Sequence, residues 1–98
     1  MVCSVCDWDP EKERESFRKH GISFDVACCV FGDPHREEVE DDGDYGEVRW
    51  IATGMVDTEI LVVVYTERNG VERIITARKA APQEERAYYA RLRWPKRI

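Results

Sequence analysis

The strongest constraint on the fold lies in the segment EILVVVYTERNGVERIITARKA at residues 59–80. Its first part is apolar on both faces from Ile60 to Tyr65, which is typical of a central, fully buried strand. Asn69-Gly70 follows and is a strong hairpin signal, because these two residue types tolerate the positive φ angles of a tight turn. The segment therefore predicts two antiparallel strands, the first of them central in a sheet.

Two helices are expected before this sheet. Residues 8–21 favour a helix with Asp9 as its N-cap, Gly21 at its end and Phe17 as its only large apolar anchor. Residues 23–34 favour a second helix, capped by Ser23 and stopped at Asp33 and the proline after it. Its apolar stripe comprises Phe24, Ala27, Cys28 and Phe31.

Further strands are expected at 3–7, 36–40 and 47–54, and a last helix begins at Pro82 and ends at Pro95. A chain of 98 residues has room for one core, so we expect a single domain over residues 1–98. The order predicts an α+β fold with two N-terminal helices, an antiparallel meander of four or more strands and a C-terminal helix. The helices should cover one sheet face and leave the other as a working surface.

Side-chain alternation suggests where chemistry could lie on that surface. In the last strand it places Arg78 with Thr76 and Ile74, and it places Lys79 with the residues at 73, 75 and 77 on the opposite face. Glu47 and Arg49 share one face of a neighbouring strand. Arginines beside a carboxylate base suit RNA cleavage by attack of the 2′-hydroxyl. The alternative is an ordinary salt bridge between strands.

Lys19 and His20 end the first predicted helix and allow two interpretations. Cations at a helix C-terminus are favoured by the helix dipole, which accounts for them without catalysis. A histidine can also act as a general acid near neutral pH, since its ordinary pKa allows both protonation states.

The charge distribution is uneven. The net charge is −5, but residues 1–48 carry 14 acidic and 5 basic side chains, whereas residues 49–98 carry 6 acidic and 10 basic ones. The total argues against nucleic-acid binding, and the basic second half weakens that objection because the local field matters more than the total. The acidic half could equally be a solubilising surface.

The four cysteines are Cys3, Cys6, Cys28 and Cys29. Cys3 and Cys6 have the spacing of half a zinc site or of a redox pair. Adjacent cysteines on a helix diverge by about 100° and suit one tetrahedral ion poorly, so we favour cysteines that pack in the core and expect no metal and no cofactor. No apolar run approaches a membrane span, and we expect a cytoplasmic protein.

Five segments in order resemble the BrnT family of bacterial type II toxins. They are residues 7–34, DYGEVRWIATGM, LVVVYTER, RIITARKA and EERAYY, and together they span residues 7–89. The resemblance implies a fold like that of the RelE-type ribonucleases and an activity that cleaves RNA and inhibits growth. It also implies neutralisation by BrnA, a ribbon-helix-helix antitoxin that carries the operator-DNA binding of the complex.

The resemblance also implies site residues. The Lys-His-Gly stretch of the family falls on Lys19, His20 and Gly21, and its Glu-x-Arg falls on Glu47 and Arg49. Its Ser/Thr-Ala-Arg ends on Arg78, and its helix Glu and Tyr fall on Glu84 and Tyr88. We expect Arg78 and Arg49 to hold the scissile phosphate, Glu47 to be the base, and His20 or Lys19 to be the acid. Further RNA contacts are expected from Lys79, Arg73, Arg68 and Tyr88.

The chain departs from the family pattern in three places. Cysteines occupy the N-terminus where relatives tend to carry a large apolar residue, and Ala81 replaces the threonine that caps the last helix, which should cost about 1 kcal/mol. The acidic segment at 38–47 is a poor neighbour for RNA and could face a basic surface of the antitoxin. We therefore expect a metal-independent endoribonuclease toxin; the alternative is a degenerate toxin that only binds the antitoxin and modulates repression.

Overall fold

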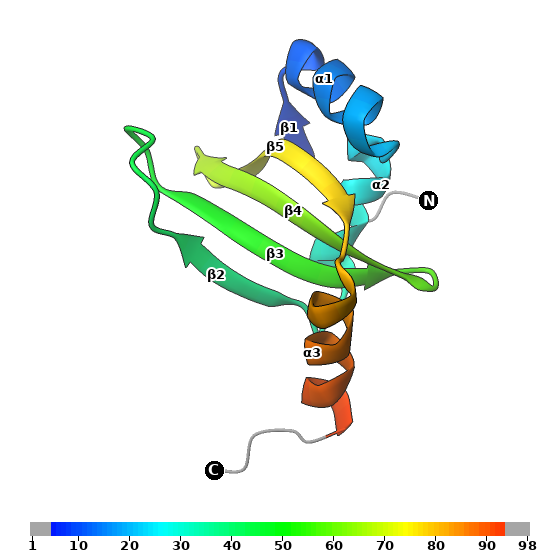
Figure 1. Ribbon diagram of the computed structural model, residues 1–98. Coiled ribbons are helices and arrows are strands. Elements are labelled where there is room, and N and C mark those ends of the chain that lie inside the picture. Colours follow the sequence, from blue (N-terminus) through cyan, green and yellow to red (C-terminus); the bar gives the residue numbers. More distant parts are fainter. Residues whose placement is uncertain (1–4, 94–98) are drawn as a thin grey trace.

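A computed structural model describes residues 5–93 of the chain. An α+β fold and a C-terminal helix are confirmed, and Figure 1 shows α1 beside β1 and β5, with α3 leading away from the sheet. Cys3 and Pro95, which the sequence placed in the first strand and after the last helix, lie outside the described residues. The elements in chain order are β1 (Cys6–Trp8), α1 (Pro10–His20), α2 (Phe24–Cys28), η1 (Cys29–Gly32), β2 (Glu37–Asp41), β3 (Arg49–Val56), β4 (Glu59–Arg68), β5 (Val71–Lys79) and α3 (Pro82–Arg93).

Helix α1 begins and ends where its sequence predicts. The Asp9 side chain accepts a hydrogen bond from the Glu11 backbone N–H, and Gly21 ends the helix with φ 72°. The expectation that Phe17 anchors the helix is wrong, because Phe17 is 52% exposed. The buried residue is Ser16, whose hydroxyl bonds to the backbone of Ala77 and so holds α1 along the edge of β5 beyond β1.

The second predicted helix divides into α2 and the 3-10 helix η1. The Ser23 side chain caps α2 by accepting from the Val26 N–H. Asp33 follows η1 with extended backbone, so the helical segment stops where the sequence indicates. The fully buried side chains Phe24 and Val30 point into the core from this segment.

The sheet is mixed and has the strand order β1-β5-β4-β3-β2. Strands β2 to β5 form the expected antiparallel meander, with β4 in the middle, whereas β1 pairs parallel with β5. The helical segment supplies the long crossover that a parallel pair requires. Asn69 and Gly70 have φ angles of 54° and 77° in the turn between β4 and β5, as the hairpin signal predicts.

A β-bulge in β5 overturns the alternation expected for that strand. Tyr65 pairs with Ile74 and Val64 pairs with Thr76, so Ile75 is an extra residue on β5. The side chains before the bulge therefore lie on the sheet face opposite to the one that strict alternation predicts. Arg73 shares the face of Arg78, not that of Lys79.

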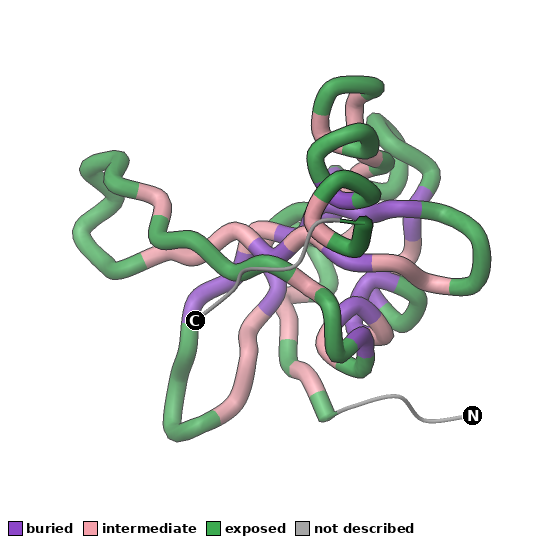
Figure 2. Tube along the Cα trace, turned by 90° about the horizontal axis from the view of Figure 1, so that it is seen from below, coloured by how far each residue is buried: buried purple, intermediate pink, exposed green. Residues whose placement is uncertain are grey.

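One face of the sheet forms the core. Its side chains Ala52, Val63 and Ala77 pack with α2 and η1, and Figure 2 shows the buried segments gathered in the interior. The opposite face carries Thr76, which is exposed, but also Val62, which is 2% exposed. The expected free face is therefore open only in part.

Cysteines join two elements of the core. Cys28 is 5% exposed and forms a disulfide with Cys6 of β1, with 6.1 Å between the two Cα atoms. Core packing of Cys28 is confirmed, but the covalent bond was not predicted, and it gives Cys6 a partner other than Cys3. The disulfide fastens the short strand β1 to α2 across the whole of α1.

Candidate functional site

Polar side chains from several elements surround a cavity of about 130 Å³ at one end of the sheet, on the face opposite the core. By the strand registers, Arg49, Thr66 and Arg73 lie side by side across β3, β4 and β5. The bulge at Ile75 is what brings Arg73 to this face. The cavity is lined by Asp9, Lys12, Glu47, Arg49, Thr66, Arg68, Arg73, Ile74 and Ile75.

Glu47 lies between two arginines in this cavity. Its carboxylate is 3.6 Å from Arg49 Nε and 3.7 Å from an Arg68 terminal nitrogen. Both distances exceed those of a good hydrogen bond, so the carboxylate is attracted to both guanidinium groups and locked to neither. Glu47 precedes β3, and the hydroxyl of Thr66 binds the next carbonyl, that of Val48, at 2.7 Å, which ties this segment to β4.

The Arg49 guanidinium is held in place by an aromatic ring, and one of its N–H groups makes no hydrogen bond within the described chain. Its guanidinium lies 4.0 Å from the centre of the Tyr45 ring, and the Tyr45 hydroxyl donates to Asp41. Its Nε is buried and has no hydrogen-bond partner among residues 5–93. Buried polar atoms are almost always satisfied, so an orphan donor at a cavity indicates room for an acceptor.

Arg73 and Arg78 differ in their surroundings although they share a face. Arg73 donates to Asp7 of β1 and lines the cavity. Arg78 instead forms two hydrogen bonds of 2.8 and 2.9 Å with Glu84 of α3. These bonds lower the pKa of Glu84 to about 2, although burial acts in the opposite direction, and they raise the pKa of Arg78.

Glu84 also compensates for the missing cap of α3. Its carboxylate accepts the Ala81 backbone N–H at 2.7 Å, three residues earlier, which is half of a capping box. Glu84 therefore holds both the start of α3 and the end of β5.

The remaining predicted site residues do not line the cavity. Lys19 and His20 are exposed at the far end of α1, and Lys79 forms an ion pair with Glu59 at 2.9 Å. Tyr88 is 2% exposed, and its hydroxyl donates to Asp33. The structure thus brings together Glu47, Arg49, Arg68 and Arg73 of the predicted set.

Sequence reasoning missed the contributions of the N-terminal segment to this cavity. Asp9 and Lys12 line it, and Asp7 binds Arg73. Lys12 carried one usable signal, because a cation in the first turn of a helix is unfavourable. The proximity to Arg73 depends on the parallel pairing of β1 with β5, which had no sequence signal.

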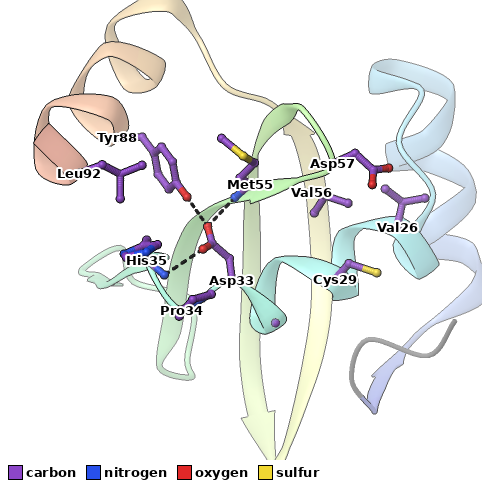
Figure 3. Close-up of a pocket in the computed structure, with 11 residues that line it drawn as sticks. Val26, Cys29, Asp33, Pro34, His35, Met55, Val56, Asp57, Tyr88 and Leu92 are labelled. Carbon is purple, nitrogen blue, oxygen red and sulfur yellow. Dashed lines mark hydrogen bonds between the residues drawn. The ribbon is translucent and has the colours of Figure 1, made fainter.

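A larger cavity of about 760 Å³ lies between η1, the turn after β3 and α3 (Figure 3). Its polar centre is Asp33, which accepts hydrogen bonds from the Met55 and His35 N–H groups and from the Tyr88 hydroxyl. Burial alone would raise the pKa of Asp33, but these bonds lower it. Burial, followed by the bond to Asp33, raises the pKa of Tyr88 to about 12. This arrangement fastens α3 to the segment that follows η1.

Residues 5–93 contain no group of three or more histidine, cysteine or acidic side chains that could hold a metal ion. Within the same range, no helix is long and apolar enough to cross a membrane.

Comparison with known proteins supplies the identity that the cavity alone does not. No curated protein matches the chain. A family model described as the ribonuclease toxin BrnT of type II toxin–antitoxin systems matches residues 8–84, which include every residue lining the small cavity. An antitoxin partner follows from membership in a type II system. The chain belongs to the BrnT family of ribonuclease toxins.

Proposed function

We propose that this chain is a metal-independent endoribonuclease and that the scissile phosphate binds in the cavity between Glu47, Arg49 and Arg73. The observation that carries the proposal is a carboxylate shared loosely by two arginines, with the buried Nε of Arg49 3.6 Å from that carboxylate and without a hydrogen bond among residues 5–93. A carboxylate between two guanidinium groups, with the third guanidinium of Arg73 in the same cavity, matches the needs of a reaction that moves a proton while negative charge grows on phosphate oxygens.

Apart from water, the proposed reaction needs no group from outside the RNA and the chain. Glu47 accepts the proton of a 2′-hydroxyl, and the 2′-oxygen attacks the adjacent phosphorus. Arg49 and Arg73 bind the non-bridging oxygens, with Arg68 neutralising charge at the cavity mouth. The bond from phosphorus to the 5′-oxygen breaks, and that oxygen takes a proton from water or from a cation of the site. The products are a 2′,3′-cyclic phosphate and a 5′-hydroxyl.

Arg78 has a different place in this proposal from the one the sequence suggested. It lies five residues beyond Arg73 on β5, and because Ile75 is an extra residue the two arginines are only four β4 positions apart, about 13 Å by the rise of a strand. Glu84 holds the Arg78 side chain. We assign Arg78 to the anchoring of α3 and to a neighbouring phosphate whenever Glu84 releases it. His20 and Lys19, at the far end of α1, are left as contacts for flanking RNA and not as the acid.

We propose that the antitoxin is a BrnA-like ribbon-helix-helix protein, that the complex acts in the cytoplasm, and that operator DNA is contacted through the antitoxin. The acidic strand β2 and the loop after it support this division, since they offer no basic surface for DNA. Specific operator binding by the isolated chain at physiological salt would overturn the division.

The function is tested by inducing the chain without its antitoxin and following growth and RNA integrity. We expect growth arrest with wild type, and growth restored by antitoxin or by Glu47→Gln at equal expression. If wild type leaves growth unchanged at a level that still captures the antitoxin, the chain is a degenerate toxin that only binds its partner.

A further inference from the structure

Lys12 lines the cavity from α1, and no residue of α1 has a role in the reaction proposed above. It is the third residue of α1, and it lines the cavity together with residues of β4, β5 and the start of β3. Its side chain is exposed, so it buries little apolar surface and stabilises no core. A structural reason for a lysine at this position is therefore missing.

The pairing of charges sets Lys12 apart from the other cations of the cavity. Arg49 and Arg68 share Glu47, and Arg73 is held by Asp7. Within the part of the chain that the structure describes, the Lys12 ammonium has neither an ion pair nor a hydrogen bond. The nearby Asp9 carboxylate already accepts the Glu11 N–H as the helix cap. Lys12 is thus a cation with its charge still available.

The position of Lys12 along α1 is electrostatically unfavourable in the protein alone. The first turn otherwise carries Glu11 and Glu13, and the last turn carries Arg18, Lys19 and His20, which is the arrangement that the helix dipole prefers. A lysine in the first turn opposes that dipole. A bound anion in the cavity would offset this repulsion, because it attracts both the ammonium group and the positive end of the helix dipole.

An independent feature of the same cavity also requires an acceptor. Arg49 Nε is buried without a hydrogen-bond partner among the described residues. The cavity, at about 130 Å³, has room for roughly four water molecules, which suits one phosphate group better than a nucleobase with its sugar. The orphan donor and the unpaired ammonium border the same small space.

We propose that Lys12 binds the phosphate of the RNA backbone in this cavity, opposite Arg49, so that α1 and β3 hold the phosphate from two sides. The inference rests on the proposed function for the nature of the ligand. It assigns the phosphate contact of α1 to its first turn, about 10 Å by helical rise from Lys19.

The test measures binding of a single-stranded 2′-O-methyl oligoribonucleotide, which cannot be cleaved because its 2′-oxygens are blocked. Fluorescence anisotropy over a range of salt concentrations compares wild type with Lys12→Gln, Lys12→Arg and Arg14→Gln. Arg14 is the matched control, since it is a cation of the same helix, exposed and paired with Glu11 outside the cavity.

We expect Lys12→Gln to weaken binding about tenfold and to reduce the slope of log affinity against log salt by about 0.7. Lys12→Arg should retain binding within about threefold, and Arg14→Gln within about twofold. The melting temperature of Lys12→Gln should equal or exceed that of wild type, because an unfavourable charge is removed from the helix start.

Three results would overturn the inference: unchanged binding by Lys12→Gln, an equal loss in Arg14→Gln, or no binding of the oligonucleotide by wild type. Lys12-dependent binding without any cleavage of natural RNA by wild type would retain the phosphate site and remove the proposed reaction. Cleavage at the wild-type rate by Lys12→Gln would retain the proposed reaction and remove the phosphate contact of Lys12.

Discussion

At the scale of single residues, the hydroxyl of Ser16 attaches α1 to the sheet, a role that the sequence predicted for the apolar side chain of Phe17. It accepts the Ala77 N–H at 3.1 Å and donates to the Ala77 carbonyl at 3.3 Å, at the edge of β5 where strand pairing with β1 has ended. Both backbone groups would otherwise be buried without partners. The nearby Phe17 stays half exposed because α1 faces the sheet edge with the small side chain of Ser16 and not with Phe17.

Replacing Ser16 with alanine should therefore destabilise the protein more than its size suggests. We expect a loss of about 2 kcal/mol in the free energy of unfolding, since two buried backbone groups lose their partner. Phe17→Ala, on the exposed side of the same helix, should cost less than about 1 kcal/mol. Urea unfolding of the two variants checks the order, and a larger loss for Phe17→Ala would restore the apolar anchor.

Sequence patterns predicted the ends of helices well, but they predicted poorly the cavity to which several elements contribute. Asp9 and Gly21 bound α1 as expected because caps act over a few residues. The placement of Arg73 was wrong because the bulge at Ile75 arises from how β5 fits β4, and no glycine marks it. The cavity could be predicted only in part, since Glu47 and Arg49 are neighbours in sequence whereas Lys12 arrives through the tertiary fold.

At the scale of elements, α3 is attached to the body mainly through polar contacts. Glu84 binds Arg78 near its start, Tyr88 binds Asp33 in its middle, and Arg91 donates to the His35 carbonyl further on. The charged pair at the start links the helix directly to the end of β5. The attachment of α3 should therefore depend on pH.

Glu84 gives that dependence a sign. Its pKa falls from an ordinary 4.5 to about 2 in the folded protein, so its contribution is present above pH 4.5 and is lost as the pH falls from 4.5 to 2. Since both side chains are about a third or more exposed, we expect a contribution of only about 1 kcal/mol. Unfolding at pH 6 and pH 3 should show a smaller pH-dependent loss for Glu84→Gln than for wild type. Equal losses would show that the pair contributes nothing.

At the scale of the whole molecule, the disulfide joins the N-terminal strand to the core. Strand β1 has only three residues and lies at the sheet edge, so the disulfide helps to hold it in place. Its Asp7 accepts the hydrogen bond from Arg73. The sequence could not give the pairing of four cysteines, because spacing alone leaves three pairings of four cysteines open. The sheet order was predictable for the meander, whose strands follow one another, and not for the parallel strand β1.

Removing the disulfide should be costly under oxidising conditions. For cysteines separated by 22 residues, loop closure corresponds to about 3 kcal/mol, and we expect Cys6→Ala to lose about that much stability. In the presence of a dithiol reductant the difference between wild type and Cys6→Ala should nearly vanish. A difference that is the same in both conditions would mean that the bond does not stabilise the fold.

The cavity around Glu47 and Arg49 is the proposed place of RNA cleavage without a metal. The most direct measurement is the initial rate of cleavage of a single-stranded RNA by the purified chain in excess chelator, with the product ends identified, for wild type and Arg49→Gln. We predict cleavage by wild type that leaves 2′,3′-cyclic phosphates, and a loss of about 10²–10³ in kcat/KM for Arg49→Gln that retains its fold by circular dichroism. Wild-type rates in Arg49→Gln, or cleavage abolished by the chelator, would contradict the account.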